Sequence, residues 1–148
     1  MQRIVFCLIV IFSGAAAHKS SSQEQDRFMI RMRLLLDIVD QLKNYMNYLA
    51  PDFFAAPQDI KDHCELSAFS CFQKAELKII NAGDNEKMIQ TRIHQLRRKL
   101  PPTKEGKKQK HKPELECPAC DSYEKKPPKE FLERLKSLLQ RIIYQHAS

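Results

Sequence analysis

Glycine is scarce in this chain, with three Gly among 148 residues, beside eight Pro and abundant Leu, Ile and Lys. Sheets built from many short strands need frequent Gly- and Pro-rich turns, so this composition does not favour a β-sandwich. The length corresponds to one ordinary domain with enough chain to bury a core.

Motifs of catalysis and metal binding are also missing. No nucleophile motif of the G-x-S-x-G type occurs, and the histidines form no metal-ligand pair at helical spacing. The five are His18, His63, His94, His111 and His146. We therefore expect no enzyme, no metal site and no cofactor.

The chain lacks an Asn-x-Ser/Thr acceptor, which predicts no N-linked glycan. It also lacks a long apolar run outside its first residues. There, the single charge of Arg3 precedes an apolar stretch over residues 4–12 and small residues at 13–17, the three parts of a secretory signal. The stretch is far below the roughly 20 residues of a membrane-spanning helix, so an uncleaved anchor is disfavoured and we expect a soluble, secreted product.

The signal also predicts the domain organisation. An Ala15-x-Ala17 pattern indicates cleavage before His18, with a later site near Gln23 as the alternative. Removing 17 residues from 148 leaves 131. We predict a signal peptide over residues 1–17, or as far as residue 22, and one domain over residues 18–148 with a basic crossover loop over residues 101–127.

Four of the five cysteines form two close pairs, Cys64 with Cys71 and Cys117 with Cys120, whereas Cys7 lies in the signal. In a secreted chain such pairs predict two disulfides. A four-cysteine zinc site is disfavoured because the first pair is spaced more widely than zinc ligands usually are. A thioredoxin-type redox motif is disfavoured because no strand pattern precedes Cys117.

Hydrophobic periodicity predicts four helices. The first covers about residues 26–49 and ends before Pro51, and a weaker second helix covers about residues 58–78. A turn-rich break over residues 81–85 precedes the third helix, which stops at Pro101. The fourth opens at Pro127 and Pro128, where proline is tolerated in the first turn. The apolar positions are Met29, Met32, Leu35, Leu36, Val39, Leu42, Met46 and Leu49 in the first helix, Ile60, Cys64, Ala68, Phe69, Cys71, Phe72 and Ala75 in the second, Ile89, Ile93, Leu96 and Leu100 in the third, and Phe131, Leu132, Leu135, Leu138, Leu139 and Ile142 in the fourth.

The connections constrain the topology. The first helix is about 36 Å long at ~1.5 Å per residue, and the loop that follows can return along it, so the second helix can run parallel to the first. The short break makes the second and third helices antiparallel, and the long crossover lets the fourth run parallel to the third. The predicted fold class is an all-α, up-up-down-down four-helix bundle with two disulfides.

Reach also limits the disulfide pairing. If Cys64 and Cys71 both lie on the second helix, they are about 10 Å apart at ~1.5 Å per residue, beyond the ~7 Å limit for a disulfide. The two remaining connectivities both join this helix to Cys117 and Cys120. Spacing alone does not separate them.

Three blocks of sequence carry a family resemblance: residues 31–45, residues 67–75, and residues 117–134, which read CPACDSYEKKPPKEFLER. They resemble the interleukin-21 family of short-chain four-helix cytokines, and the likeness spans essentially the whole chain. The crossover from residue 103 to residue 116 and parts of the third helix vary. The resemblance implies the pairing of Cys64 with Cys117 and of Cys71 with Cys120.

The resemblance also implies a function. A monomeric ligand of this kind bridges a private class I cytokine receptor and the common gamma chain, which activates Janus kinases and STAT factors in lymphocytes. The implied private-receptor residues are Arg27, Ile30, Arg31, Arg33, Leu34, Asp37 and Tyr45 of the first helix and Lys87, Met88, Thr91, His94, Arg97 and Lys99 of the third. The implied gamma-chain residues are Gln140 and Ile143, although Ile143 also fits the edge of the core.

The helical wheel of residues 26–49 independently favours an interface. Ile30 and Leu34 lie to one side of the core stripe, which is centred on Leu35 and Val39. Their predicted neighbours on that side are Arg27, Arg31, Ile38 and Tyr45. Single exposed apolar residues are common, but apolar residues flanked by arginine and an aromatic ring are typical of interfaces.

A basic run over residues 97–112 supports an alternative function, because it holds eight Lys and Arg against one acid, Glu105. The run fits a solvated loop, a segment that steers receptor association, or a site for heparan-type polyanions. The alternative is a secreted cationic protein that binds polyanions or membranes through this run. Nucleic acid is disfavoured because no aromatic residues are interleaved with the lysines.

Overall fold

The computed structural model describes residues 26–101 and 117–147. The predicted signal peptide and residues 102–116 of the basic crossover therefore lie outside the described residues. Four α-helices form within these ranges: residues 26–44, α2 (Glu65–Gln73), α3 (Glu86–Arg97) and α5 (Pro128–Ala147). Short 3-10 turns cover Met46–Tyr48, Gly83–Asn85 and Cys120–Ser122, and two short strands are β1 (Phe54–Ala55) and β2 (Lys125–Lys126).

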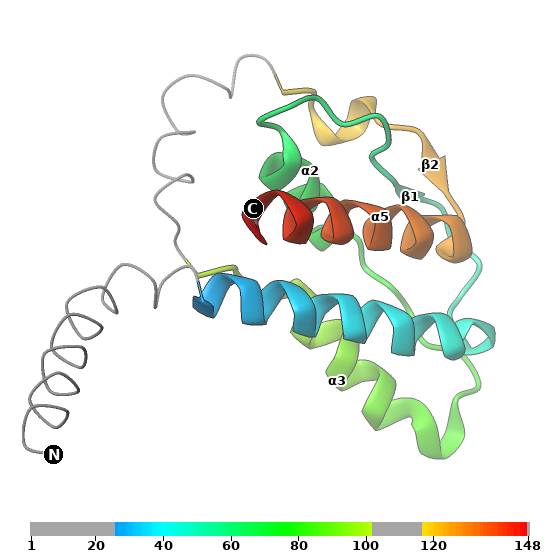
Figure 1. The fold of residues 1–148 in the computed structure, drawn as a ribbon. Helices are drawn as coiled ribbons and strands as arrows, with labels where there is room; N and C mark the ends of the chain where they lie inside the picture. Colours follow the sequence, from blue (N-terminus) through cyan, green and yellow to red (C-terminus); the bar gives the residue numbers. More distant parts are fainter. Residues whose placement is uncertain (1–25, 102–116, 148) are drawn as a thin grey trace, which may run out of the picture.

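Side-chain contacts establish the helix directions. The start of the 26–44 helix meets the end of α5, where the Phe28 and His146 rings lie 4.9 Å apart, so these two helices are antiparallel (Figure 1). Arg31 near the same start contacts Gln95 near the end of α3, and Arg141 near the end of α5 contacts Glu65 at the start of α2. The 26–44 helix and α2 thus run one way, and α3 and α5 run the other, which confirms the up-up-down-down bundle.

The core lies between the four helices and is built from the apolar stripes of each. All six residues of the predicted α5 stripe are buried, and so are three of the four predicted in α3. Leu100, the fourth, follows the end of α3 at Arg97 and is half-buried against the core. Burial of such stripes is the main stabilising force in a bundle of this size.

The predicted second helix is wrong in its bounds, since residues 58–78 shorten to α2 over Glu65–Gln73. Before α2, Asp59 and His63 adopt positive φ values of 54° and 72°, which a right-handed helix does not allow. After α2, residues 74–80 alternate between exposed and half-buried positions, the period of an extended segment. The connection from α2 to α3 is therefore longer than the predicted five-residue break.

The first helix is shorter than predicted, because helical residues end at Asn44 and a 3-10 turn over Met46–Tyr48 follows. Two of its side chains are also more deeply buried than predicted. Ile38, which we placed beside Ile30 and Leu34, is fully buried, and Phe28, which we left out of the core, exposes only 2% of its surface. The buried stripe is wider than the narrow seam that the prediction assumed.

Two short antiparallel ladders close the ends of the long connections. Phe54 pairs with Lys126 and Ala55 with Lys125, which joins the segment after the first helix to the segment before α5. A single bridge pairs Leu49 with Ile79. These pairings join the connection after the first helix to the other two connections and leave the fold predominantly helical.

Two disulfides join α2 to the segment that leads into α5. Cys64 bonds to Cys117 with Cα atoms 5.6 Å apart, and Cys71 bonds to Cys120 with Cα atoms 5.4 Å apart. This is the pairing that the family resemblance implies. Cys64 caps the start of α2 and Cys71 lies near its end, so the bridges fasten both ends of the helix.

Candidate functional site

The 26–44 helix carries two large apolar side chains in solvent. Ile30 exposes 65% of its surface and Leu34 exposes 43%. At 3.6 residues per turn, both lie on the same side of the helix as Arg31, which contacts α3. Both side chains lie outside the core stripe, as the wheel predicted, and the apolar pair borders the seam between the 26–44 helix and α3.

Arg31 connects the two sides of this seam. Its Nη2 atom donates a hydrogen bond of 2.9 Å to the backbone oxygen of Gln95, while its Nε atom is buried without a hydrogen-bond partner. Burial, followed by the nearby positive charge of Arg98, lowers the pKa of Arg31. Part of this guanidinium is thus committed to the packing of α3 and is not available to a partner.

The predicted residues of α3 and its end mostly point outward. Lys87, Thr91, His94, Arg97 and Lys99 are exposed, and Met88 is half-buried against the core. Thr91 donates its hydroxyl to the backbone oxygen of Lys87 at 2.8 Å, and the Nε atom of Arg97 donates to the backbone oxygen of Gln73 at 3.2 Å. Arg97 is therefore held against the end of α2.

Three further predicted residues of the 26–44 helix are spread around it. Arg27 is exposed on the α3 side, and Arg33 and Asp37 are exposed on its outer surface. Arg33 is seven residues from Asp40, about two turns, so it lies on the side that meets α5. Tyr45 follows the helix, is half-buried and lies 6.2 Å from the Tyr48 ring.

A second seam lies between the 26–44 helix and α5. Asp40 and Lys136 form an ion pair of 2.8 Å across it. Gln140 is exposed, and Ile143 is half-buried and packs against the core. Lys136, Gln140 and Ile143 follow one another at steps of four and three, which aligns them along one flank of α5.

Sequence reasoning missed three residues of this second seam. Met29 and Leu36 were assigned to the core but are only half-buried. They are seven residues apart, and Leu36 lies one turn before Asp40, which pairs with Lys136, so both lie on the α5 side of their helix. Tyr144 exposes 79% of its surface, four residues after Gln140. The signal was available for Tyr144, because an aromatic residue stood outside the apolar stripe of its helix.

The opposite flank of α5 is fastened to α2. Arg141 donates to the backbone oxygen of Ile60 at 2.7 Å, to Asp62 at 3.0 Å and to Glu65 at 3.2 Å, and Gln145 also donates to Glu65 at 3.1 Å. Glu65 exposes only 7% of its surface, so this carboxylate depends on those donors. The network fixes the rotation of α5 about its axis, and with it the direction in which Gln140 points.

The disulfides remove two of the alternative chemistries. Each of the four sulfur atoms is bonded to one other in a disulfide, so the four cysteines form neither a zinc site nor a free redox dithiol. Over residues 26–101 and 117–147, no group of three His, Cys, Asp or Glu side chains is arranged to hold a metal ion. In the same part of the chain, no helix has the length and apolar character needed to cross a membrane.

A comparison with known families adds an independent finding. The family model described as Interleukin 15 matches residues 4–144. This match covers nearly the whole chain, including the first three helices, α5 as far as Tyr144 and both disulfides.

Proposed function

The chain belongs to the interleukin 15 family, whose members are cytokine ligands rather than enzymes, and on that premise we propose that it joins two different receptor chains. The finer assignment is an interleukin-21-type ligand. It is secreted, binds a private class I cytokine receptor and the common gamma chain, and brings together their associated Janus kinases, which activate STAT factors in lymphocytes. The protein itself performs no chemistry.

One observation carries this proposal: the 26–44 helix has a partly apolar seam on each side. The seam with α3 exposes Ile30 and Leu34, and the seam with α5 offers Met29, Leu36 and Ile143 at half-burial. A ligand with a single partner needs only one such surface. Two seams on different flanks allow two receptors to bind without touching the same side chains.

The α3 seam is our candidate for the private receptor. An apolar centre with charged residues at its edge is the arrangement of many protein interfaces. The proposed set starts from this seam and extends over the outer surface of the 26–44 helix as far as Arg33, on the α5 side. It comprises Arg27, Ile30, Arg31, Arg33, Leu34, Asp37, Tyr45, Lys87, Met88, Thr91, His94, Arg97 and Lys99. Within it, Ile30 and Leu34 are the best candidates for the centre because they are apolar and exposed.

The α5 seam is our candidate for the common gamma chain. The proposed contacts are Gln140 and Ile143, to which the fold adds Tyr144, one turn beyond Gln140 and exposed. Tyrosine is enriched at interface hot spots because it buries a large rigid ring while its hydroxyl keeps a polar partner.

Two double variants test both assignments in one experiment. Ile30→Asp with Leu34→Asp places two charges on the α3 seam, and Gln140→Asp with Tyr144→Asp places two on the α5 seam. All four positions are exposed, so the fold should be retained. Surface plasmon resonance should show that the α3-seam variant loses affinity for the private receptor by about 30-fold or more and binds the common gamma chain unchanged, and that the α5-seam variant does the reverse. The reason is that an unpaired charge buried at the centre of an interface removes the contribution of a hot spot.

Phe53→Asp is the matched control, since Phe53 is also apolar and 65% exposed but belongs to neither seam. It should bind both ectodomains like the unmodified protein. If both double variants weaken the same receptor, or if the protein cannot hold both ectodomains in one complex, the two-seam proposal is wrong.

A further inference from the structure

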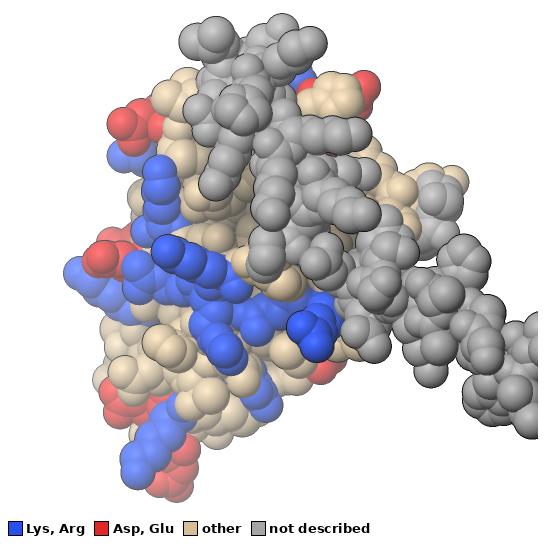
Figure 2. Space-filling view, turned by 90° about the vertical axis from the view of Figure 1, so that its left-hand side faces the viewer, with Lys and Arg blue, Asp and Glu red and all other residues tan. Residues whose placement is uncertain are grey.

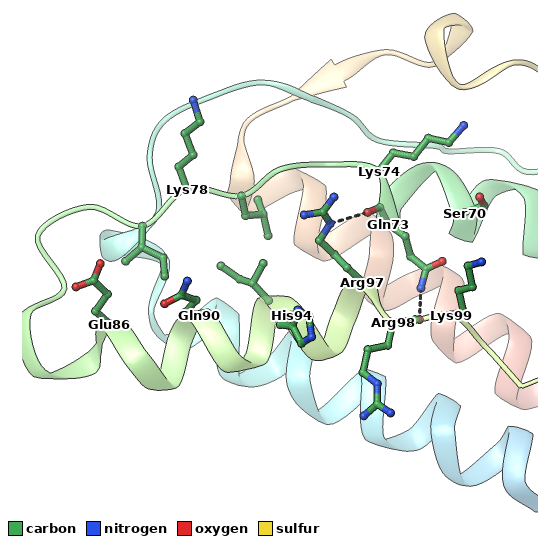
Figure 3. Close-up of a pocket in the computed structure, with 13 residues that line it drawn as sticks. Ser70, Gln73, Lys74, Lys78, Glu86, Gln90, His94, Arg97, Arg98 and Lys99 are labelled. Carbon is green, nitrogen blue, oxygen red and sulfur yellow. Dashed lines mark hydrogen bonds between the residues drawn. The ribbon is translucent and has the colours of Figure 1, made fainter.

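A groove runs along the flank of α3 that faces away from the 26–44 helix. Its walls come from α3 and the residues that follow it, from the end of α2, and from the extended segment over residues 74–80 (Figure 3). The aliphatic side chains of Leu77, Ile79 and Ile93 contribute apolar surface to the groove. Along an α3 of 12 residues, it extends for about 18 Å at ~1.5 Å per residue.

Positive charge surrounds the groove on both sides. Lys74 and Lys78 stand on the rim formed by the extended segment, and the alternating burial of this segment directs both into solvent. Arg97, Arg98 and Lys99 follow at the end of α3, and His94 lies one turn before Arg98. In Figure 3 Lys74 and Lys78 project from the extended segment and Arg98 lies on the α3 side, while Arg97 reaches from α3 toward Gln73 on the other wall. Glu86 at the far end is the one acidic residue in its lining, within the part of the chain that the structure describes.

Within residues 26–101 and 117–147, none of these lysines and arginines forms an ion pair with a carboxylate. The described ion pairs involve Lys126, Lys136 and Arg141, and none includes a lysine or arginine of the groove. Glu76 is exposed on the same extended segment but does not line the groove. The positive electrostatic field of these residues extends beyond the groove. The charge of Arg98, for example, helps to lower the pKa of Arg31 on the neighbouring helix.

The wider surface has the same character. Figure 2 views the end of the molecule where the 26–44 helix begins, and Lys and Arg form a broad continuous band across it, with acidic residues at the margins. A single-sign surface of this kind attracts polyanions at long range, and a groove within it concentrates the field.

We propose that this groove binds a sulfated polysaccharide. The cations from two separate elements can contact successive sulfate groups along one extended chain, while the aliphatic surface accommodates the sugar rings. A single-stranded nucleic acid is the less suitable occupant, because no Phe, Tyr or Trp is among the lining residues to provide a stacking platform for the bases. The groove shares Arg97, Arg98 and Lys99 with the predicted basic run and adds Lys74 and Lys78 from another element.

The groove also shares residues with the proposed private-receptor surface, and this consequence rests on the proposed function. His94, Arg97 and Lys99 line the groove and belong to the private-receptor set. A polysaccharide in the groove should therefore compete with the private receptor and leave the common gamma chain unaffected, because Gln140 and Tyr144 lie on α5.

The direct test uses a size-defined heparin oligosaccharide and no receptor. Lys74→Gln with Lys78→Gln removes two groove charges that lie outside both receptor sets. The control variant, Lys125→Gln with Lys129→Gln, also removes two positive charges, from exposed positions that do not line the groove. Isothermal titration should show about fivefold weaker binding for the groove variant, the effect of losing two exposed charge contacts, and a smaller salt dependence. The control variant should bind like the unmodified protein.

Three results would overturn the proposal. The first is an equal loss of affinity in the groove and control variants. The second is no loss in the groove variant while neutralising Lys107, Lys108, Lys110 and Lys112 abolishes binding. The third is displacement of the oligosaccharide by single-stranded DNA at equal charge. Because no receptor is present, these results leave the receptor assignments untouched. If the oligosaccharide binds as expected but does not compete with the private receptor, only the shared-residue consequence is wrong.

Discussion

The two halves of the bundle are held together by different forces. On one side, α2 is joined by two disulfides to the segment before α5 and by the Arg141 and Glu65 network to α5 itself. On the other, the 26–44 helix and α3 share buried apolar residues and the link from Arg31 to the backbone of Gln95. The covalent frame therefore lies away from Ile30 and Leu34, and the proposed private-receptor seam depends on ordinary packing.

The largest effect should come from breaking the covalent half. Replacing Cys71 and Cys120 with serine opens a bridge that spans 49 residues of sequence. Because the Cys64–Cys117 bridge remains in this variant, the chain-entropy account applies to the short circuit between the two bridges, and it gives a loss of about 3 kcal/mol. Chemical denaturation, followed by circular dichroism, should show a loss of that size.

The two bridges should not contribute independently. Once Cys71 and Cys120 are joined, the second bridge closes a circuit of seven residues from Cys64 to Cys71 and three from Cys117 to Cys120, ten in all. Such a short circuit contributes only about 3 kcal/mol. Removing both bridges should cost about 7 kcal/mol, because the first bridge of an open chain closes a long loop worth about 4 kcal/mol and the second adds about 3. This loss exceeds the sum of the two single losses, about 3 kcal/mol each, and a strictly additive result would contradict the nested arrangement.

The packed half can be tested by comparing two neighbouring positions. Ile38→Ala removes a fully buried side chain and should lower the free energy of unfolding by about 3 kcal/mol, the usual cost of a core cavity. Leu34→Ala removes an exposed one and should change stability by about 0.5 kcal/mol or less. Equal losses would mean that Leu34 is part of the core.

That pair also shows what sequence could predict. Periodicity correctly assigned Leu35 and Val39 to the core and Ile30 and Leu34 to the surface, because a helical stripe follows from spacing alone. It misplaced Ile38, which lies at the edge of the stripe. Whether an edge position is buried depends on how closely α3 packs against the 26–44 helix. That distance cannot be predicted from the residue pattern of one helix.

The bounds of the second helix were predicted wrongly for a different reason. Residues 74–80 contain Ala, Leu and two Ile, which suit a helix wheel as well as an alternating segment. Tertiary pairing decides between them, since Leu49 bridges Ile79 from a distant part of the chain. By contrast, α5 was predicted well, because Pro128 marks its start and the spacing of its six apolar residues fits a helix and not an alternating segment. The groove cations Lys74 and Lys78 were missed for the same reason as the segment that carries them.

The noncovalent contacts of the fastened half can be weakened separately. Arg141→Met removes the donors that serve Glu65 and the backbone of Ile60 and leaves a nearly buried carboxylate with Gln145 as its donor. We expect a loss of about 2 kcal/mol in thermal or denaturant unfolding, because unpaired buried acceptors are costly. Arg134→Met is the control, since Arg134 makes a single hydrogen bond, to the backbone of Ala56. It should cost less.

The smallest effect concerns the exposed ion pair beside β2. A hydrogen bond from Lys126, and then its charge, lowers the pKa of Glu124. A carboxyl with a lowered pKa in the folded state stabilises the fold above its unfolded pKa, and this contribution is lost as pH falls through the folded pKa. Lys126→Met should therefore raise the pKa of Glu124 in an NMR titration, and its stability difference from the unmodified protein should shrink in acid. Lys125→Met, on the adjacent strand position, should leave the Glu124 titration unchanged. A shift with Lys125→Met would show that general surface charge, rather than this pair, sets the pKa of Glu124.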